Sequence, residues 1–251
     1  MLVMGILNVT PDSFADGGLH YDTDIATARG YEMVEEGVDI IDVGGESTRP
    51  GADRVSQEEE IARTIPVITE LAKHGATISI DTMRASTARA AVKAGAAMIN
   101  DVSGGLADDA MLQTAAELKV PYIAMHWRGQ SKDMNSKAIY GDVVNEVIAE
   151  LNERIDAALD AGIDKDKLII DPGIGFAKDA EHNWAIIDSI DRFVAMGYPV
   201  LVGASRKRFL GGESPDEREQ ATIELTKRLG TTGIWAVRVH SVKPHKEVLS
   251  S

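Results

Sequence analysis

The sequence predicts an α/β fold: one (β/α)8 barrel, a TIM barrel, that occupies residues 1–251 as a single domain. Three observations predict it. Eight short apolar runs alternate with stretches of helical character, which is typical of parallel strands joined by right-handed helical crossovers. The runs are continuously apolar, as strands buried on both faces are. The length of 251 residues suits eight such units. A doubly wound open sheet is the alternative fold.

The expected strands are the apolar runs themselves. They cover residues 2–7, 38–43, 77–80, 97–99, 122–125, 168–170, 200–202 and 234–239. In a (β/α)8 barrel the carboxyl ends of all strands lie on one face, and that face holds the active site. The residues that follow each run are therefore expected to meet there.

Helices are expected between the strands, because apolar residues recur there at helical spacing, for example over residues 61–71. Ser56 followed by Glu59 is typical of a helix start. Ser214 before Pro215 predicts another start, with the proline in the first helical position. Glycines are expected to end several helices. They are Gly37, Gly75, Gly95 and Gly162.

The composition limits the classes of function. The chain has no cysteine, which excludes disulfides and thiolate metal sites and favours a reducing, cytoplasmic location. Its formal net charge of −14 argues against a nucleic-acid-binding face. No apolar run approaches the roughly 20 residues of a membrane span, and the start of the chain lacks the basic region of a signal peptide. An anionic small substrate stays compatible, because a local cluster of cations can reverse the field in a cleft.

Polar or charged side chains lie at or shortly after the end of every expected strand. They are Asn8, Asp42, Asp81, Asn100 with Asp101, His126, Asp171, Ser205 with Lys207, and Arg238 with His240. Any one of them is also typical of a helix cap or a turn, and Asp42 and Asp101 are open to that interpretation. Eight such contributions to one face of a barrel predict a polar pocket instead.

Two stretches sharpen this prediction. IDVGGESTRPGA, residues 41–52, is rich in polar groups and contains Arg49, which can bind phosphate or carboxylate in a bidentate manner. A solvated turn is the alternative for that stretch. DPGIGFAK, residues 171–178, predicts a tight turn that leaves Asp171 facing the pocket. A carboxylate there can accept two hydrogen bonds from the edge of a guanidine-like ring.

Several other catalytic patterns are not supported. VGASRKRF, residues 202–209, resembles a nucleophile elbow only superficially, because Lys207 stands where the second glycine is needed. We expect Lys207 to point into the pocket. The six histidines lack the spacing of zinc ligands, and there is neither a P-loop nor a complete dinucleotide fingerprint. His126 suits a hydrogen-bonded wall residue as well as a catalyst. Some apolar side chains suit either an aromatic slot or the core. They are Met125, Trp127 and Phe176.

The residues alone predict carboxylates and amides on one side of the barrel mouth and cations on the other. The cationic side is Arg49, Lys207, Arg238 and His240. This arrangement suits a flat, hydrogen-bonding heterocycle that carries an anionic group.

Eight stretches, taken in order, carry a resemblance to a known family. GILNVTPDSFADGG, IDVGGESTRPGA, SIDT, INDVSGG, MHW, DPGIGFAK, GASRK and RVH resemble dihydropteroate synthase, a pterin-binding family, and MHWR is similar to its actinobacterial members. The resemblance implies a (β/α)8 barrel that is usually a homodimer. It implies condensation of 7,8-dihydropterin-6-ylmethyl diphosphate with 4-aminobenzoate, which gives 7,8-dihydropteroate and diphosphate in folate biosynthesis. Magnesium is the implied cofactor, and sulfonamides are the implied inhibitors.

The resemblance also implies roles for matching residues. The pterin is expected to bind Asp81, Asn100, Asp171 and Lys207, with Asp42 deeper in the barrel. The diphosphate is expected near Asn8, Thr48, Arg238 and His240, with magnesium bound through Asn8. The 4-aminobenzoate is expected at Phe14, Asp16, Arg49, Pro50 and Ser205. Charge in the reaction is expected to be stabilised by Asp81, Asp171, Lys207, Arg238 and His240. The polar stretch after Asn8 is expected to be a mobile catalytic loop that bends at Gly17 and Gly18.

The sequence departs from the family pattern at a few positions. Ser241 stands where an aspartate usually follows RVH, and Ala15 replaces a common serine. The segment between Phe209 and Glu217 is short. Residues 243–251 are expected to be too few for a full final helix, which weakens the expectation of a dimer.

Two other functions remain as alternatives. One is a non-catalytic pterin-binding paralogue, which the presence of every motif group opposes. The other is a methyltetrahydrofolate:corrinoid methyltransferase domain, which would not need the STRPG and RVH loops that are present here.

Overall fold

The computed structural model describes residues 1–10, 19–46, 54–130 and 134–250, and within them parallel strands form one eight-stranded sheet in the order β6-β5-β4-β3-β2-β1-β8-β7. The strands are β1 (Leu2–Asn8), β2 (Ile40–Gly44), β3 (Ile78–Asp81), β4 (Met98–Asp101), β5 (Tyr122–Met125), β6 (Leu168–Asp171), β7 (Leu201–Val202) and β8 (Ala236–Val239). All eight expected strands are therefore confirmed, with bounds that differ by no more than two residues.

The sheet closes on itself between β6 and β7. Ile170 of β6 forms one parallel bridge with Val200, the residue before β7. The Ile170 N–H also donates to Pro199 O at 2.9 Å. By comparison, β1 and β2 pair over five residues. The closed sheet confirms the (β/α)8 barrel and excludes the open doubly wound alternative.

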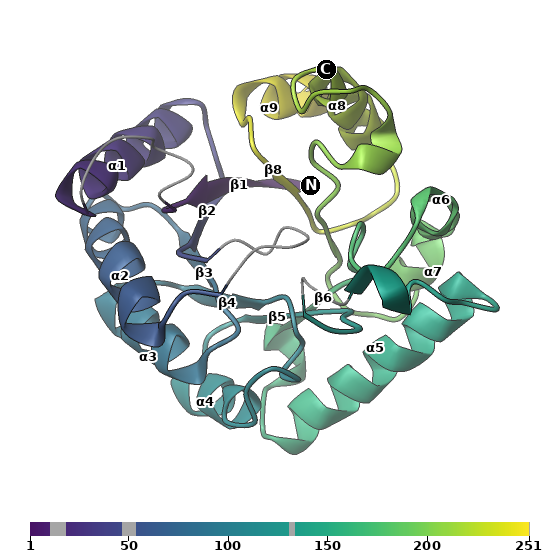
Figure 1. The fold of residues 1–251 in the computed structure, drawn as a ribbon, viewed down its shortest axis with the longest axis horizontal. Coiled ribbons are helices and arrows are strands. Elements are labelled where there is room, and N and C mark those ends of the chain that lie inside the picture. Colours follow the sequence, from purple (N-terminus) through teal and green to yellow (C-terminus); the bar gives the residue numbers. More distant parts are fainter. Residues whose placement is uncertain (11–18, 47–53, 131–133, 251) are drawn as a thin grey trace.

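Helices surround this barrel, as Figure 1 shows. They are α1 (Leu19–Glu35), α2 (Gln57–Lys73), α3 (Ala85–Ala94), α4 (Met111–Leu118), α5 (Val143–Asp160), α6 (Ala180–Asp188), α7 (Ile190–Val194), α8 (Glu217–Leu229) and α9 (Lys243–Ser250). Among the described helices, none combines the length and the apolar character that crossing a membrane requires.

The main apolar core lies between the strands and the helices. Outward strand residues such as Ile41, Ile80 and Val237 pack there with Leu71 of α2 and Leu225 of α8. Burying a side chain of this size contributes about 1.5–3 kcal/mol relative to its exposure. This core covers the outer face of the strands, and a second apolar layer covers most of their inner face, which explains why the runs are largely apolar.

A smaller apolar layer fills the inside of the barrel. It takes one residue from each of seven strands and is packed by Leu2 and Trp235. The seven are Met4, Ile40, Met98, Ile123, Ile169, Leu201 and Ala236. The interior of the barrel is therefore filled with apolar side chains at the height of these seven residues. The site can only lie nearer the carboxyl ends of the strands.

The helix ends agree with the sequence in part. Ser56 caps α2, since its Oγ accepts the Glu59 N–H at 3.1 Å. The predicted start at Ser214 and Pro215 is wrong by two residues, because α8 begins at Glu217. Ser214 Oγ instead accepts the Glu217 N–H at 3.2 Å and donates to the Glu217 carboxylate at 3.0 Å, which closes a turn before the helix.

The end of the chain forms a helix after all. Residues 243–250 make α9, contrary to the expectation that they are too few. His245 explains this, because it is fully buried and its Nδ1 lies 2.8 Å from Thr226 Oγ1 of α8. An eight-residue helix is marginal alone, and tertiary packing of this kind is what stabilises it.

Candidate active site

The polar mouth of the barrel follows from the two-residue period of its strands. Side chains two residues apart point to the same side of a strand. The inner apolar layer is therefore followed, two residues onward, by a polar layer. The successive pairs are Ile40 and Asp42, Met98 and Asn100, Ile169 and Asp171, and Ala236 and Arg238. The structure thus brings together residues that the sequence predicted from strand ends alone.

Arg238 lies between two carboxylates. Its Nε donates to Asp42 Oδ2 and its Nη2 donates to Asp81 Oδ2, both at 2.6 Å. We call these three residues the Arg238 cluster. The sequence placed Arg238 on the side opposite the carboxylates, and the structure corrects this. Two neighbouring buried carboxylates require a counter-ion, and the arginine side chain reaches across the interior from β8 to supply it.

Part of this polar layer has no partner. Asp42 is fully buried, and its Oδ2 also accepts a hydrogen bond from Asn100 Nδ2 at 2.9 Å. Its Oδ1 has no hydrogen-bond partner within the described residues, and neither has Ser79 Oγ on β3. An unpaired buried polar atom costs about 1–3 kcal/mol. Atoms of this kind indicate where a polar ligand would bind.

Asp81 is poised to change its charge near neutral pH. Burial raises its pKa to about 7; the charge of Arg238 opposes that rise, and the nearby Asp42 adds to it. The Asp81 carboxyl can therefore bind a ligand in either protonation state.

Asp171 forms the other acidic wall. It accepts a hydrogen bond from the Gly173 N–H at 2.7 Å. Burial raises its pKa, against the hydrogen bond from Gly173 and the charge of Lys207. A Cβ built on Gly203 would lie 3.8 Å from Asp171 Oδ2. The absent side chain of Gly203 therefore leaves space in front of this carboxylate.

Lys207 also faces the mouth, as the sequence predicted. Its Nζ donates to Ile174 O and lies 4.4 Å from the centre of the Phe176 ring. Burial lowers its pKa to about 8, although the charge of Asp171 opposes this. The ammonium group therefore remains mostly charged at neutral pH.

Ser205 and His240 are joined across two strand ends. Ser205 Oγ lies 2.9 Å from His240 Nδ1, and the His240 N–H donates to the same oxygen at 3.2 Å. Ser241, the departure from the family pattern, accepts a hydrogen bond from Arg206 Nη2 at 2.8 Å. His240 is consequently held in place despite the loss of the aspartate.

An apolar patch borders the carboxylates. Met83, Val102 and Met125 form a small cluster that is separate from both cores, with Trp127 and Phe176 packed against it. From the sequence, Met125, Trp127 and Phe176 suit either an aromatic slot or the core. Their separation from the cores favours a flat apolar wall for a ring.

Sequence reasoning missed Lys178, the last residue of the DPGIGFAK stretch. Its buried Nζ contacts His126 Nδ1 at 2.9 Å and donates to Gly173 O and Phe176 O at 3.0 and 3.1 Å. Burial lowers the pKa of Lys178 to about 7. Its place in an otherwise apolar turn was the only available signal.

His126 is a wall residue. Its Nε2 lies 2.9 Å from Glu150 Oε2, and its ring is almost fully buried. Burial lowers its pKa to about 4, so the ring is neutral. Together with Lys178, His126 supports the turn from which Asp171 projects. Of the two roles that the sequence allowed for His126, wall residue and catalyst, the structure favours the first.

Asp101 is structural. Its two oxygens accept hydrogen bonds from Ser103 N–H and Oγ, Gly105 N–H and Tyr122 Oη at 2.7–2.8 Å. It is adjacent to Asn100 and therefore points to the other side of β4. This confirms the interpretation of Asp101 as a turn former.

Five predicted site residues lie outside the described part of the chain. They are Phe14, Asp16, Thr48, Arg49 and Pro50. The same holds for the expected bend at Gly17 and Gly18.

Asn8 was predicted to bind magnesium, and its surroundings suit an oxygen ligand. It ends β1 and pairs with Gly44 of β2. A Cβ on Gly44 would lie 3.7 Å from both Asn8 Oδ1 and Asp81 Oδ2, so the missing side chain leaves open space there. Magnesium takes few protein oxygens when phosphates supply the others. In the described ranges no group of three or more acidic or histidine side chains could hold a metal ion unaided.

The sequence matches the family of pterin binding enzymes over residues 4–240. A curated relative is the dihydropteroate synthase of Mycobacterium leprae (strain TN), which is 49% identical over 257 aligned positions that cover 98% of this chain and 90% of that protein.

Solved structures give the same result. Xanthomonas albilineans dihydropteroate synthase with 4-aminobenzoic acid superposes with a TM-score of 0.93 at 44% identity and covers 99% of this chain and 90% of that one. The same enzyme with 7,8-dihydropteroate gives a TM-score of 0.89 at 41% identity, with 99% and 91% of the two chains covered.

Proposed function

The chain belongs to the pterin-binding enzymes and, within them, to the dihydropteroate synthases, and on that premise we propose how its barrel mouth performs the reaction. The enzyme is a transferase that joins 7,8-dihydropterin-6-ylmethyl diphosphate to 4-aminobenzoate, releasing diphosphate and 7,8-dihydropteroate. The observation that carries the proposed site is the partly unpaired polar layer of Asp42, Asn100 and Asp171 with Arg238.

The pterin ring binds this polar layer through its hydrogen-bonding edges. Its amino and amide nitrogens form a guanidine-like edge, and carboxylates accept such pairs of donors. Asp171 and Asp81 supply carboxylates on opposite sides of the mouth, and the patch of Met83, Val102 and Met125 borders one face of the ring. Lys207 donates to a ring acceptor from beside Asp171.

The leaving group departs toward His240 and Arg238, the arginine that also pairs with Asp42 and Asp81. The C–O bond between the methylene carbon and the diphosphate breaks, and the negative charge that develops on the oxygens is stabilised by Arg238 and His240. The amine of 4-aminobenzoate then forms the C–N bond and loses a proton. No protein nucleophile is needed, and the pterin cation is stabilised by the charge of Asp171.

Magnesium is proposed at Asn8, whose amide oxygen borders the open space beside Gly44. The ion would neutralise charge on the diphosphate when both are bound. Asn8→Ala is expected to raise the magnesium concentration needed for half-maximal rate. An unaltered magnesium titration would contradict this role.

We also propose that the enzyme is a homodimer. Trp184 of α6 is 37% exposed, and its ring packs edge-to-face against the Phe209 ring with the two ring centres 5.3 Å apart. This aromatic pair lies at the surface of the late helices. Large exposed aromatic side chains are typical of interfaces. Light scattering is expected to give twice the chain mass; a monomer at all concentrations would exclude the dimer.

The activity test measures both products. Purified protein receives the pterin diphosphate and magnesium, with and without 4-aminobenzoate, while diphosphate release and dihydropteroate are followed together. Equal amounts of both are expected, and a sulfonamide is expected to raise the KM for 4-aminobenzoate. Pterin binding without product would favour the non-catalytic paralogue.

Gly203→Ala tests the location of the pterin. The new Cβ would lie 3.8 Å from Asp171 Oδ2, an ordinary contact that leaves the fold intact but occupies the space in front of the carboxylate. Pterin affinity is expected to fall while thermal stability stays unchanged. Gly141→Ala is the matched control, since its Cβ would lie 3.6 Å from Glu146 at the surface. Equal pterin affinity in both variants would disprove this placement.

A further inference from the structure

Arg206 has an unusual backbone conformation next to the site. It is one of three residues other than glycine with positive φ among those described, and its φ is 57°. A long side chain in this left-handed region costs about 1–2 kcal/mol and requires support from its surroundings. Arg206 stands between Ser205 and Lys207, the two members of this loop that face the mouth.

Helix α8 supplies most of that support, at the backbone and at the side chain of Arg206. The Arg206 N–H donates to Thr222 Oγ1 at 3.1 Å, and its carbonyl oxygen accepts from Arg218 Nη1 at 3.1 Å. Its side-chain Nε donates to the Glu219 carboxylate. Its Nη2 donates to Ser241 Oγ at 2.8 Å. Three residues within about one turn of α8, together with Ser241, thus fix one residue of the loop.

Glu219 is the central acceptor of this arrangement. It is partly buried, and although burial opposes its ionisation, the neighbouring His245 and Arg206 lower its pKa to about 2. Its Oε1 lies 3.4 Å from His245 Nε2, but neither atom completes a hydrogen bond within the described chain. The ion pair with Arg206 is the closer of these two contacts of the Glu219 carboxylate.

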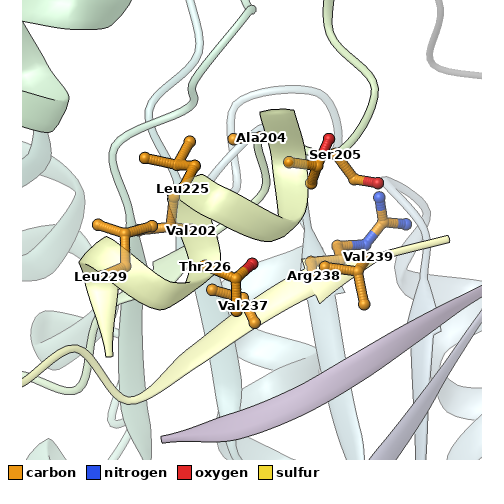
Figure 2. A pocket seen from close by; sticks show the side chains of 10 residues that line it. Val202, Ala204, Ser205, Leu225, Thr226, Leu229, Val237, Arg238 and Val239 are labelled. Carbon is orange, nitrogen blue, oxygen red and sulfur yellow. The ribbon is translucent and has the colours of Figure 1, made fainter. Parts of the chain in front are cut away.

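The helix that carries Glu219 is fixed to the barrel. Figure 2 shows Leu225, Thr226 and Leu229 of α8 beside Val202 and Val237 of β7 and β8. In the same view Ser205 and Arg238 lie at the mouth end of these strands. A rigid helix anchored in this way can hold the loop in one position.

The left-handed conformation of Arg206 determines where the side chains of Ser205 and Lys207 point. Because Arg206 is left-handed, the chain reverses between Ser205 and Lys207, so that Ser205 contacts His240 while Lys207 contacts Ile174 O and the Phe176 ring. If Arg206 relaxed to negative φ, the two side chains could not keep both contacts at once.

We propose that Glu219 of α8 is a positioning residue for the reaction: through Arg206 it holds the left-handed turn that points Ser205 and Lys207 at the substrates. This inference rests on the proposed function, in which Lys207 binds the pterin, and on the expectation from the family resemblance that Ser205 binds 4-aminobenzoate. It also explains why Ser241 is tolerated. The carboxylate that Arg206 needs comes from Glu219, and Ser241 accepts one further hydrogen bond from the Arg206 guanidinium.

The test compares variants that separate the left-handed turn at Arg206 from the ion pair between Arg206 and Glu219. Glu219→Gln removes the charge that holds Arg206. Arg206→Ala removes the ion pair with Glu219 but keeps a Cβ in the left-handed region, whereas Arg206→Gly removes the ion pair and adopts positive φ without steric strain. The double variant Glu219→Gln/Arg206→Gly completes a cycle. Glu224→Gln is the control, because Glu224 is an exposed carboxylate of α8 that contacts Gln220.

Pterin diphosphate affinity is measured by calorimetry, and the KM for 4-aminobenzoate and kcat by product formation. Glu219→Gln and Arg206→Ala are expected to weaken pterin binding and raise the KM by about tenfold. Arg206→Gly is expected to stay close to the wild type, and Glu219→Gln is expected to have no further effect in that background. Glu224→Gln is expected to match the wild type throughout.

Two results would overturn the inference. One is a Glu219→Gln protein that melts at lower temperature but binds both substrates as the wild type does, since that is a purely structural role. The other is Arg206→Gly binding no better than Arg206→Ala. A wild type that releases no dihydropteroate would overturn the proposed function itself, and the inference with it.

Discussion

Arg84 and Arg238 each bridge two carboxylates, and of these two arginines only Arg238 belongs to the active site. Arg84 Nη1 donates to Glu46 at 2.7 Å and to Glu60 at 2.6 Å; we call these three residues the Arg84 cluster. Arg238 donates to Asp42 and Asp81 at 2.6 Å. The two arginine side chains are similarly buried, with 16% and 19% of their surface exposed. Burial and ion pairing therefore do not distinguish a structural cluster from a catalytic one.

The difference lies in how completely the carboxylate oxygens are paired. Glu60 Oε1 accepts from Thr82, Glu60 Oε2 accepts from Arg84 and Thr87, and Glu46 accepts from Arg54 as well as Arg84. All four oxygens of the Arg84 cluster therefore have partners. Asp42 Oδ1 of the Arg238 cluster has none among the residues described. Between these two clusters, the unpaired oxygen is what distinguishes the one at the site.

Arg238→Met is expected to have the largest effect. Removing one partner of a buried ion pair destabilises by about 3–5 kcal/mol. Because Arg238 also faces the leaving group, the kcat of the folded fraction is expected to fall by about 10²–10³-fold. Urea unfolding and product formation at low temperature measure the two losses. A variant that loses stability but keeps its kcat would remove the distinction between the clusters.

Arg84→Met is expected to lose a similar free energy of unfolding, about 3–5 kcal/mol, because it leaves two buried glutamates without a counter-ion. The affinity of the folded protein for the pterin is expected to change far less than in Arg238→Met, since the Arg84 cluster acts on the polar layer only through the charge of Glu60 near Asp81. Calorimetry on folded protein checks this. A loss of pterin affinity as large as in Arg238→Met would mean that the Arg84 cluster is part of the site.

The Arg238 cluster is also expected to titrate. Asp81 has a pKa of about 7 when folded, against 3.8 for an ordinary aspartate. Between these values the unfolded chain has released a proton that the folded chain still binds, so stability is full below about pH 4 and falls as pH rises toward 7. Urea unfolding of the wild type against Asp81→Asn measures this difference. A wild type that gains stability over Asp81→Asn as the pH rises from about 4 to about 7 would mean that the pKa of Asp81 is not raised.

Thr87→Val is expected to have the smallest effect. It removes one of two donors to Glu60 Oε2 and leaves the shape of the side chain intact, which costs about 1 kcal/mol. Substrate KM values are expected to stay unchanged. Thr69→Val is the control, because Thr69 only bonds to Ile65 O of its own helix. Equal stability of the two variants would show that Glu60 does not need the third donor.

The sequence predicted the strands well, since their apolar runs and following polar residues are local features. It also predicted most of the polar layer, because strand period and barrel topology together decide where Asp42, Asn100 and Asp171 point. The prediction from the sequence placed both Asn100 and Asp101 at the mouth, although neighbouring residues of a strand point to opposite sides. Only Asn100 contacts the Arg238 cluster.

Other features depend on contacts between distant parts of the chain, and no local pattern contains them. Arg238 reaches carboxylates that lie 196 and 157 positions away. The left-handed turn at Arg206 depends on α8, and the formation of α9 depends on the burial of His245. In each case a side-chain interaction overrides what the segment itself predicts.

The single bridge that joins β6 to β7 has a consequence for the dynamics of the empty enzyme. Amide protons next to this seam are protected by the fewest ladder hydrogen bonds of the barrel, so hydrogen–deuterium exchange should proceed first there, by local opening. Asp171 ends β6 and Lys207 follows β7, which means that a pterin held by both would cross the seam. Substrate binding would then slow exchange on the two strands together, and the ligand would complete the ring that the backbone closes only weakly.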